Sequence, residues 1–191
     1  MSLRSLFIQR FKELRGEPFF APEPSQAIWG ILKSLTSQGT VPNRAISWGV
    51  ERSHLPSEPP SNWEIAILEE YNEPLLPIVN KARVGIGKSA HLIAESGSLV
   101  LFWDSYGEKL IRTLPDIFLC LAYNAQLFKD LEEFLTLSPP TGSFTVLSGP
   151  SRTADIEKQL VIGAHGPGRV ILLTDWEELK DIGTNNLSSE L

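Results

Sequence analysis

Residues 148–173 read SGPSRTADIEKQLVIGAHGPGRVILL, and this stretch determines which fold is expected. The flanking segments SFTVLSG (143–149) and RVILLTD (169–175) have the apolar character of strands. The spacing of apolar residues between them predicts a helix over 153–162. We therefore predict a unit in which helix 153–162 makes a right-handed connection between two strands, 143–149 and 169–174, of one sheet.

The same alternation of strands and helices extends through the rest of the chain. Further strands are predicted for 44–50, 63–68, 83–87, 98–103 and 116–122. Strands of continuous apolar character that alternate with helices indicate a largely parallel sheet covered on both faces. The predicted fold class is α/β, with three layers and a mostly parallel sheet, and ligands are expected at the carboxyl ends of its strands.

The sequence pattern of the N-terminal part of the chain predicts a separate helix and a linker. Apolar residues recur at helical spacing from Leu3 to Leu14, which indicates an amphipathic helix that packs on the domain or on a partner subunit. Residues 16–24 are rich in proline and are predicted to form an extended linker. The chain therefore divides into a helix and linker (1–24), a single α/β domain (25–180) and a polar tail (181–191).

Two more helices are predicted inside the domain. Ser25 is placed to cap a helix that continues to Ser37, and Gly39 stops it. The second helix, at 125–135, has Leu127, Phe128, Leu131 and Leu135 on one face.

Composition excludes several classes of protein. The formal net charge is -6 over 191 residues, and no cluster of Lys and Arg is dense enough for a phosphate backbone, so nucleic acid is not an expected partner. Cys120 is the only cysteine, which excludes a disulfide, a thiolate zinc site and an iron–sulfur cluster held by this chain alone. Its apolar surroundings predict a buried, inert thiol.

No apolar run approaches the ~20 residues that span a bilayer, and no signal-peptide core is visible, so a cytoplasmic protein is expected.

The turn GPSRT (149–153) has the residues of an anion site. The first N–H groups of a following helix would be unpaired and carry partial positive charge. Ser151 or Thr153 can cap one of them, Gly149 lets the backbone approach a ligand, and Arg152 adds a planar fork for a carboxylate or phosphate. The alternative is an ordinary capped helix with an exposed arginine, and Asp155 would oppose a bound anion. Spacing alone does not decide between the two.

The second turn, 163–169, contains His165 between small residues. This histidine can orient a ligand, move a proton or bind a metal. A lone histidine in a glycine-rich turn more often only hydrogen-bonds the backbone. His54 and His91 show no ligand spacing with it, so no metal site is predicted.

A third candidate is the turn Glu95–Ser96–Gly97, which interrupts the apolar run 91–103. A carboxylate beside buried strands is costly unless it is paired or used. The alternative is a turn in which Glu95 only caps or pairs with a structural neighbour.

ARVGIGKS (82–89) matches a loose nucleotide-loop pattern, but we reject that interpretation. A phosphate loop lies between a strand and a long helix, whereas RVGIG itself has the pattern of a strand. A nucleotide hydrolase is therefore not predicted.

Two stretches together, IAESGSLVL (93–101) and GPSRTADIE (149–157) with GAHGPGRVILL (163–173), resemble the LUD-domain family of lactate-utilisation protein C type. The resemblance is firm from Val84 to Asp175 and looser before it. It implies the α/β fold shared by CoA transferases and ribose-phosphate isomerase. It also implies a role in bacterial oxidation of L-lactate to pyruvate, with no cofactor in this chain and iron–sulfur clusters on cysteine-rich partner proteins.

The resemblance also marks residues. The candidate catalytic residues are Glu95 and His165, and the marked ligand-binding residues are Ser96, Gly97, Gly149, Ser151, Arg152, Thr153 and Gly166. The three turns are expected to converge on one cleft at the carboxyl ends of the strands, where Arg152 takes a carboxylate and Glu95 and His165 handle a hydroxyl or its proton.

Three functions remain open at this point. The first is a subunit of a lactate-oxidising system that binds a small carboxylate and works with iron–sulfur partners. The second is a CoA-transferase-like enzyme that uses Glu95, although the asparagine found beside the glutamate of such enzymes is missing. The third is a non-catalytic interaction module on the same fold.

Overall fold

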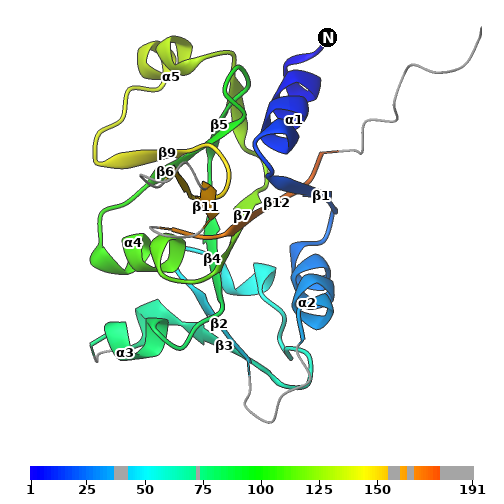
Figure 1. Ribbon diagram of the computed structural model, residues 1–191, viewed down its shortest axis with the longest axis vertical. Helices are drawn as coiled ribbons and strands as arrows, with labels where there is room; N and C mark the ends of the chain where they lie inside the picture. Colours follow the sequence, from blue (N-terminus) through cyan, green and yellow to red (C-terminus); the bar gives the residue numbers. More distant parts are fainter. Residues whose placement is uncertain (37–42, 72–73, 155–159, 163–165, 177–191) are drawn as a thin grey trace, which may run out of the picture.

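The computed structural model describes residues 1–36, 43–71, 74–154, 160–162 and 166–176. In this part the chain forms a six-stranded sheet, a four-stranded sheet and a two-stranded hairpin, with helices packed around them (Figure 1). The α/β class predicted from the sequence is confirmed, and the six-stranded sheet is parallel throughout.

The large sheet has the strand order β1-β12-β7-β4-β2-β3. Its strands are β1 (Glu17–Phe20), β2 (Asn43–Ser47), β3 (Trp63–Ile67), β4 (Val84–Lys88), β7 (Ile117–Ala122) and β12 (Arg169–Thr174). Every residue of β7 is buried, because this strand lies in the middle of the sheet and both faces are covered. Continuous apolar runs such as IFLCLA are typical of parallel strands in that position.

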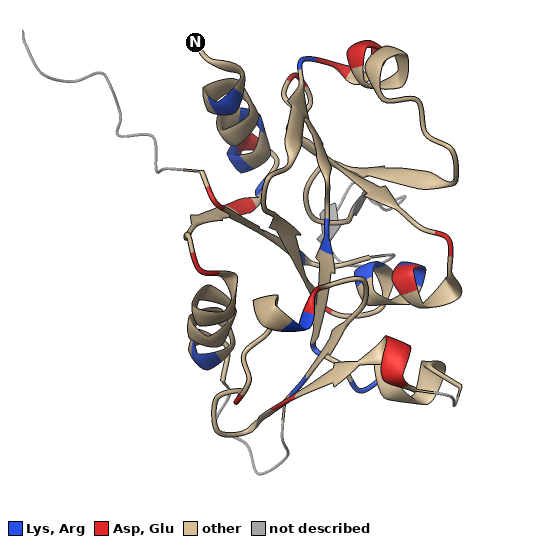
Figure 2. Cartoon of the chain, turned by 180° about the vertical axis from the view of Figure 1, so that it is seen from behind, with Lys and Arg blue, Asp and Glu red and all other residues tan. Residues whose placement is uncertain are grey.

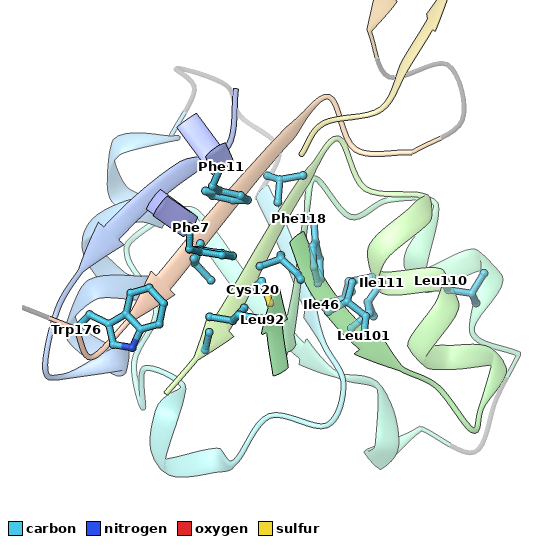
Figure 3. Close-up of a cluster of buried hydrophobic side chains, with 14 of the residues drawn as sticks. Phe7, Phe11, Ile46, Leu92, Leu101, Leu110, Ile111, Phe118, Cys120 and Trp176 are labelled. Atoms are coloured by element: carbon cyan, nitrogen blue, oxygen red, sulfur yellow. The ribbon is translucent and has the colours of Figure 1, made fainter. Parts of the chain in front are cut away.

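Different elements cover the two faces of the large sheet. Helix α2 (Pro24–Ser34) covers one face, where its Ile28, Ile31 and Leu32 pack with Leu119 of β7 and Ile171 of β12. The other face packs against α1 (Leu3–Glu13), α4 (Tyr106–Thr113) and the second sheet (Figure 1). Figure 3 shows this second core, in which Phe7 and Phe11 of α1 and Leu92 and Leu101 of the small sheet surround Phe118 and Cys120 of β7.

The small sheet has the order β8-β5-β6-β9 and was not anticipated as a separate unit. Its strands are β5 (His91–Ile93), β6 (Ser98–Phe102), β8 (Gln126–Phe128) and β9 (Phe144–Leu147). Its outer face packs against α5 (Leu131–Leu137), where Phe134 contacts Ile93, Val100 and Phe128. The small sheet therefore covers part of one face of the large sheet, where helices alone were predicted.

Three predicted elements are wrong in detail. Residues 17–20, predicted as linker, form an edge strand that pairs with β12. In the predicted helix 125–135, residues 126–128 instead form β8 beside β5, and the helix begins only after Asp130, whose side chain accepts from the N–H of Glu133. Because β9 and β12 belong to different sheets, the predicted strand–helix–strand unit does not form.

The predicted helix 153–162 is also wrong, because its two ends are strands. β10 (Arg152–Ala154) and β11 (Leu160–Ile162) pair antiparallel, with Arg152 opposite Ile162. Thr153, Val161 and Ile162 are β-branched, which favours this extended pairing over a helix.

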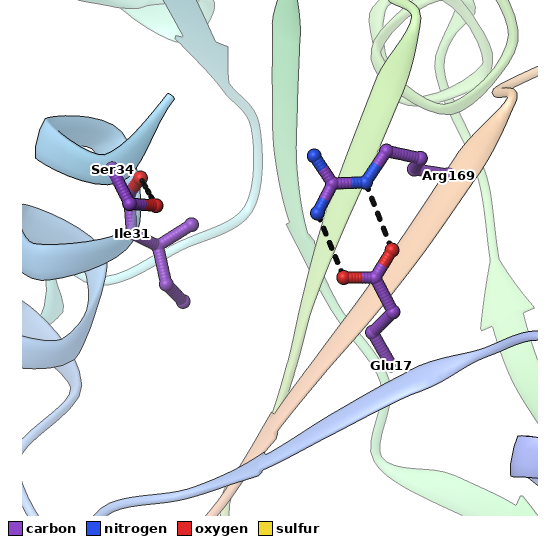
Figure 4. A network of polar contacts seen from close by, with 4 residues as sticks. All are labelled: Glu17, Ile31, Ser34 and Arg169. Carbon is purple, nitrogen blue, oxygen red and sulfur yellow. Dashed lines mark hydrogen bonds and ion pairs between the residues drawn. The ribbon is translucent and has the colours of Figure 1, made fainter. Parts of the chain in front are cut away.

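The edge strand β1 is held to the sheet by an ion pair as well as by backbone hydrogen bonds. The Arg169 guanidinium donates from Nε and Nη2 to the two carboxylate oxygens of Glu17, at 2.8 and 2.7 Å (Figure 4). The same view shows the Ser34 hydroxyl donating to the Ile31 carbonyl near the end of α2. Arg169 belongs to the GPGR turn, so this motif residue has a structural partner.

Short elements complete the described chain: α3 (Leu76–Val79) and the single 3-10 turns η1 (Arg52–His54) and η2 (Leu68–Glu70). Basic and acidic residues are interspersed over helices and loops (Figure 2). No helix in the described part is long and apolar enough to cross a membrane.

Candidate functional site

The turn at 95–97 lies beside residue 148, which precedes the predicted turn at 149–153. The Ser98 hydroxyl is 2.6 Å from the Ser148 hydroxyl and donates to the Ser96 hydroxyl at 2.7 Å. Ser98 is fully buried, whereas Ser96 and Ser148 are exposed, so a buried hydroxyl links the two segments at the surface.

The glycines of both turns are required by helix α1. Gly97 has φ +58°, and a Cβ there would lie 2.5 Å from the backbone nitrogen of Phe11. Gly149 has φ +90°, and a Cβ there would lie 2.6 Å from the carbonyl oxygen of Leu14. Both positions combine a left-handed backbone with close approach of another main chain, which only glycine permits. This packing accounts for the two glycines, and a role in ligand binding stays a prediction.

Ser151 and Gly166 are brought together at the base of the β10–β11 hairpin. The N–H of Ser151 donates to the carbonyl of Pro167 at 2.9 Å, and a Cβ on Gly166 would lie 3.2 Å from Cβ of Ser151. Arg152 and Thr153 belong to β10, so no helix begins there to offer free N–H groups. His165, Asp155 and Glu157 lie outside the described residues.

The position of these turns corrects one expectation. Gly166 and Pro167 directly precede β12, so they lie at the amino end of the parallel sheet and not at its carboxyl end. Glu95 is exposed, and its N–H donates to the carbonyl of Lys129. The pKa of Lys129 lies above its ordinary value, mainly because its ammonium donates to Asp130, while attraction from Glu95 adds a smaller part.

A large cleft opens beside Ser151 and Gly166, between α4 and strands β6 and β9. Its volume is about 710 Å³. The described lining residues are Leu76, Leu101, Trp103, Tyr106, Lys109, Leu110, Arg112, Thr113, Leu114, Thr145, Leu147, Ser151, Gly166 and Pro167. Two predicted residues, Ser151 and Gly166, therefore line the cleft, whereas Glu95, Ser96, Gly97 and Gly149 are not among its described lining residues.

A smaller cavity, about 110 Å³ in volume, lies at the carboxyl ends of β2 and β4. Its described walls are Trp48, Gly49, Gly87, Lys88, Ala90, Val100, Phe102, Glu108, Ile111, Arg112 and Phe118. This is the end of the sheet where ligands of α/β proteins bind. None of the residues predicted from the sequence is among these walls.

Arg112 lines both cavities and is the most unusual charge in the described structure. Its side chain is buried, and Nη2 donates to the carbonyl of Phe102 at 2.7 Å. Its Nε and Nη1 are also buried, and they have no hydrogen-bond partner among the described residues. Burial lowers the pKa of Arg112, and attraction from Glu108 opposes that shift. A buried guanidinium with two unsatisfied nitrogens is costly unless an anion pairs with it.

Helix α4 positions the charged walls of both cavities. Ser105 and Glu108 form a reciprocal capping box, in which Glu108 Oε2 accepts from the N–H groups of Asp104 and Ser105. This fixes Glu108 and leaves Oε1 within 4.0 Å of the place where a Cβ on Gly49 would lie. Arg112 follows one turn later on the same helix face.

Lys109, three residues before Arg112, lies on the part of α4 that lines the large cleft. Its ammonium lies 3.4 Å from the centre of the Trp103 ring, a cation–π contact on the wall of the large cleft.

The sequence did not single out Arg112, Lys109 or Glu108. The available signal was the pattern Ser105-x-x-Glu108, which marks a helix start and would have placed these three residues on one short helix. That Arg112 is buried and unpaired depends on the small sheet, which the sequence pattern does not reveal.

Two other sequence expectations concern Cys120 and the glycine-rich stretch at 82–89. Cys120 is buried as predicted, and burial raises the pKa of its thiol to about 12, which keeps it protonated and unreactive. Gly85 and Gly87 lie inside strand β4, so GIGK is part of the sheet core and forms no phosphate loop. The described residues contain no group of three His, Cys, Asp or Glu side chains that could hold a metal ion.

The chain matches a known protein family. A family model described as the LUD domain matches residues 5–173, so the chain belongs to the LUD-domain family. The match includes α1 and β1, which is consistent with their packing on the large sheet.

Named relatives come from several bacteria. The chain is 30% identical over 106 residues to lactate utilization protein C of Macrococcus caseolyticus, covering 48% of this chain and 43% of the relative. It is 27% identical over 121 residues to lactate utilization protein C of Bacillus pumilus, covering 59% and 49%. It is 32% identical over 87 residues to an uncharacterized protein of Neisseria meningitidis, covering 42% and 37%. The matches therefore span less than half the length of these relatives.

A solved structure supports the fold. The crystal structure of a DUF162 family protein from Deinococcus radiodurans superposes with a TM-score of 0.57 at 16% identity, covering 91% of this chain and 98% of that chain. At this identity the likeness establishes the fold alone.

Proposed function

We propose that this chain works in lactate utilisation, as a subunit that binds a small carboxylate in the cavity beside Arg112. Membership of the LUD-domain family and the relatives named lactate utilization protein C support the role. The observation that carries the binding proposal is the buried Arg112 guanidinium, of which two nitrogens have no hydrogen-bond partner in the described part of the chain.

The chemistry of the small cavity suits a 2-hydroxy or 2-keto acid. Arg112 offers a planar fork for the carboxylate, and Lys88 adds a second cation at the mouth. Glu108 Oε1, near Gly49, provides an acceptor for a hydroxyl group. A cavity of about 110 Å³ holds a molecule of a few heavy atoms and excludes a large one.

The proposal includes partner proteins that carry electrons. Oxidation of L-lactate to pyruvate releases two electrons and two protons, which need an acceptor. The only cysteine of this chain is buried in the sheet, so it supplies no ligand set for a cluster. We therefore assign the electron carriers to iron–sulfur proteins that bind this subunit.

Calorimetry with L-lactate and pyruvate tests the binding proposal. Wild-type protein is expected to bind at least one of the two acids and to give no binding heat with lactamide, which lacks the carboxylate. Lys88→Met is expected to weaken binding, and Arg112→Lys to weaken it further because the planar fork is lost. Lys81→Met is the matched control, since Lys81 is exposed and not among the described cavity walls. No binding heat for either acid would contradict the proposal and favour a non-catalytic interaction module.

Partner binding needs a separate measurement. Affinity purification of the tagged chain from its native cells, followed by iron and sulfide analysis, is expected to recover cluster-containing proteins. Recovery of a complex without iron would contradict the assignment of electron carriers.

The CoA-transferase alternative gains no support from the described geometry. Glu95 is exposed on a hairpin turn and is not among the described lining residues of either cavity.

A further inference from the structure

The large cleft is too big for the small acid of the proposed function. Its volume of about 710 Å³ compares with about 110 Å³ for the cavity at the carboxyl ends of β2 and β4. Sites for organic ligands range from roughly 300 to 1,000 Å³, and they combine apolar walls with a few polar groups. The large cleft has these properties.

One wall of the cleft is apolar. Leu101 and Leu147 come from the small sheet, Leu110 and Leu114 from α4 and its end, and Leu76 from the start of α3. Aromatic surface is added by Trp103 and by Tyr106, whose side chain is exposed. Such a wall binds the body of an organic molecule by removing it from water.

The charged groups of the cleft all have one sign. Lys109 and Arg112 are the only ionisable Lys, Arg, Asp or Glu side chains among its described lining residues. Neither forms a salt bridge with another described residue. Lys109 is held over the Trp103 ring, which places a cation where the apolar wall begins.

We propose that this cleft binds an amphipathic organic anion, with the acid group on Lys109 and the apolar body against the leucine wall. The inference goes beyond the proposed function, because it assigns a second and larger ligand to a different cavity. A three-carbon acid would leave most of the cleft empty and would not cover the leucines. A longer acyl or aryl acid reaches Lys109 with its acid group and covers the leucines with its apolar body.

Fluorescence of anilinonaphthalene sulfonate tests the inference, since this probe combines a sulfonate with aromatic rings. The folded wild-type protein is expected to bind the probe, and decanoate is expected to displace it more effectively than the uncharged decanol. Excess L-lactate is expected to leave the decanoate titration unchanged, so failure of lactate binding and failure of this inference give separate results.

Matched lysine variants locate the acid group. Lys109→Met is expected to weaken decanoate binding about tenfold, because one charge-assisted contact is lost. The same change should have little effect on decanol binding. Lys33→Met is the control, because Lys33 lies over the Trp29 ring in a similar cation–π contact on α2, away from the cleft. Equal weakening in both variants would overturn the assignment of the acid group.

A second variant tests the cleft without touching α4. Thr145 is an exposed cleft residue on β9, so Thr145→Glu places a negative charge in the cleft on a folded strand. This change is expected to lower affinity for decanoate, while Thr136→Glu on the exposed side of α5 leaves it unchanged. Circular dichroism checks that both variants are folded. Decanoate binding that is insensitive to Lys109→Met and to Thr145→Glu would overturn the inference.

Discussion

Gly97 illustrates how a motif residue is required by the packing around it. Substitution by alanine would put a Cβ 2.5 Å from the backbone nitrogen of Phe11, in a left-handed backbone at φ +58°. We expect Gly97→Ala to lower the free energy of unfolding by about 2 kcal/mol or more, since backbone strain and overcrowding add. Urea denaturation followed by circular dichroism measures the change.

Gly30 provides the matched control for that experiment. It lies inside α2, and a Cβ there meets no atom within 4 Å. Gly30→Ala is therefore expected to raise the free energy of unfolding by about 0.5–1 kcal/mol, because alanine favours helix. If Gly97→Ala were as harmless as Gly30→Ala, α1 would not pack on this turn as described.

The burial of His91 predicts that stability depends on pH. Its ring stacks on Phe128 with centroids 5.7 Å apart, Nε2 lies 3.3 Å from the Ser138 hydroxyl, and Nδ1 has no described partner. Burial lowers the pKa of His91 below its ordinary value of 6.5. Below that value the unfolded chain binds a proton that the folded protein does not, so stability falls as pH decreases.

The pH effect of His91 is testable with a variant that does not titrate. The loss of unfolding free energy between pH 7.5 and pH 5.5 is expected to be smaller in His91→Phe than in wild type. An unchanged difference in His91→Phe would show that other groups cause the acid sensitivity.

At the scale of elements, the ion pair between Glu17 and Arg169 joins β1 to β12. Both side chains are partly exposed, so the pair is expected to contribute modestly, and hydrogen bonding to Glu17 raises the pKa of Arg169. A double-mutant cycle with Glu17→Ala and Arg169→Ala is expected to give a coupling free energy of about 0.5–1 kcal/mol, reduced at high salt. Zero coupling at low salt would mean that backbone pairing alone holds β1.

Elements were predictable where the pattern was long and local. The apolar runs of β4, β7 and β12 and the periodic spacing of α1 and α2 correspond to the observed elements. The short strands β1, β8, β10 and β11 were missed, because they are defined by their pairing partners and not by a pattern of their own. The β10–β11 hairpin is the clearest case, because its apolar residues have helical spacing but its ends pair as strands.

At the scale of the whole molecule, the candidate site was only partly predictable. The predicted turn at Glu95–Gly97 lies beside Ser148, which precedes the predicted turn at Gly149–Thr153, and Ser151 and Gly166 line a cleft. Arg112 was missed because its importance depends on burial between two sheets, and a sequence pattern carries no information about that. The resemblance to the LUD-domain family located the motif turns. The packing identified Arg112 as a buried guanidinium with two nitrogens that have no described hydrogen-bond partner.

Helix α1 packs on the core of the domain through its buried phenylalanines. The sequence leaves open whether this helix packs on the domain or on a partner, and the structure places it on the domain (Figure 3). Phe7 and Phe11 are fully buried, and their rings stack with centroids 5.7 Å apart. The Phe7 ring also meets the Trp176 ring edge-on, with centroids 5.6 Å apart. Phe7→Ala is therefore expected to cost about 3–5 kcal/mol, a large part of the stability of an ordinary domain.

Leu3→Ala is the control on the same helix, because Leu3 is 41% exposed and its truncation should change stability by about 0.5 kcal/mol at most. Urea denaturation of both variants distinguishes the two roles of α1. A helix that serves only to bind a partner would tolerate both changes in the isolated chain, whereas a helix that completes the core tolerates only the change at Leu3. Because Gly97 and Gly149 also pack on α1, loss of Phe7 is expected to loosen both motif turns as well, and faster hydrogen exchange of the Gly97 and Gly149 amides would report it.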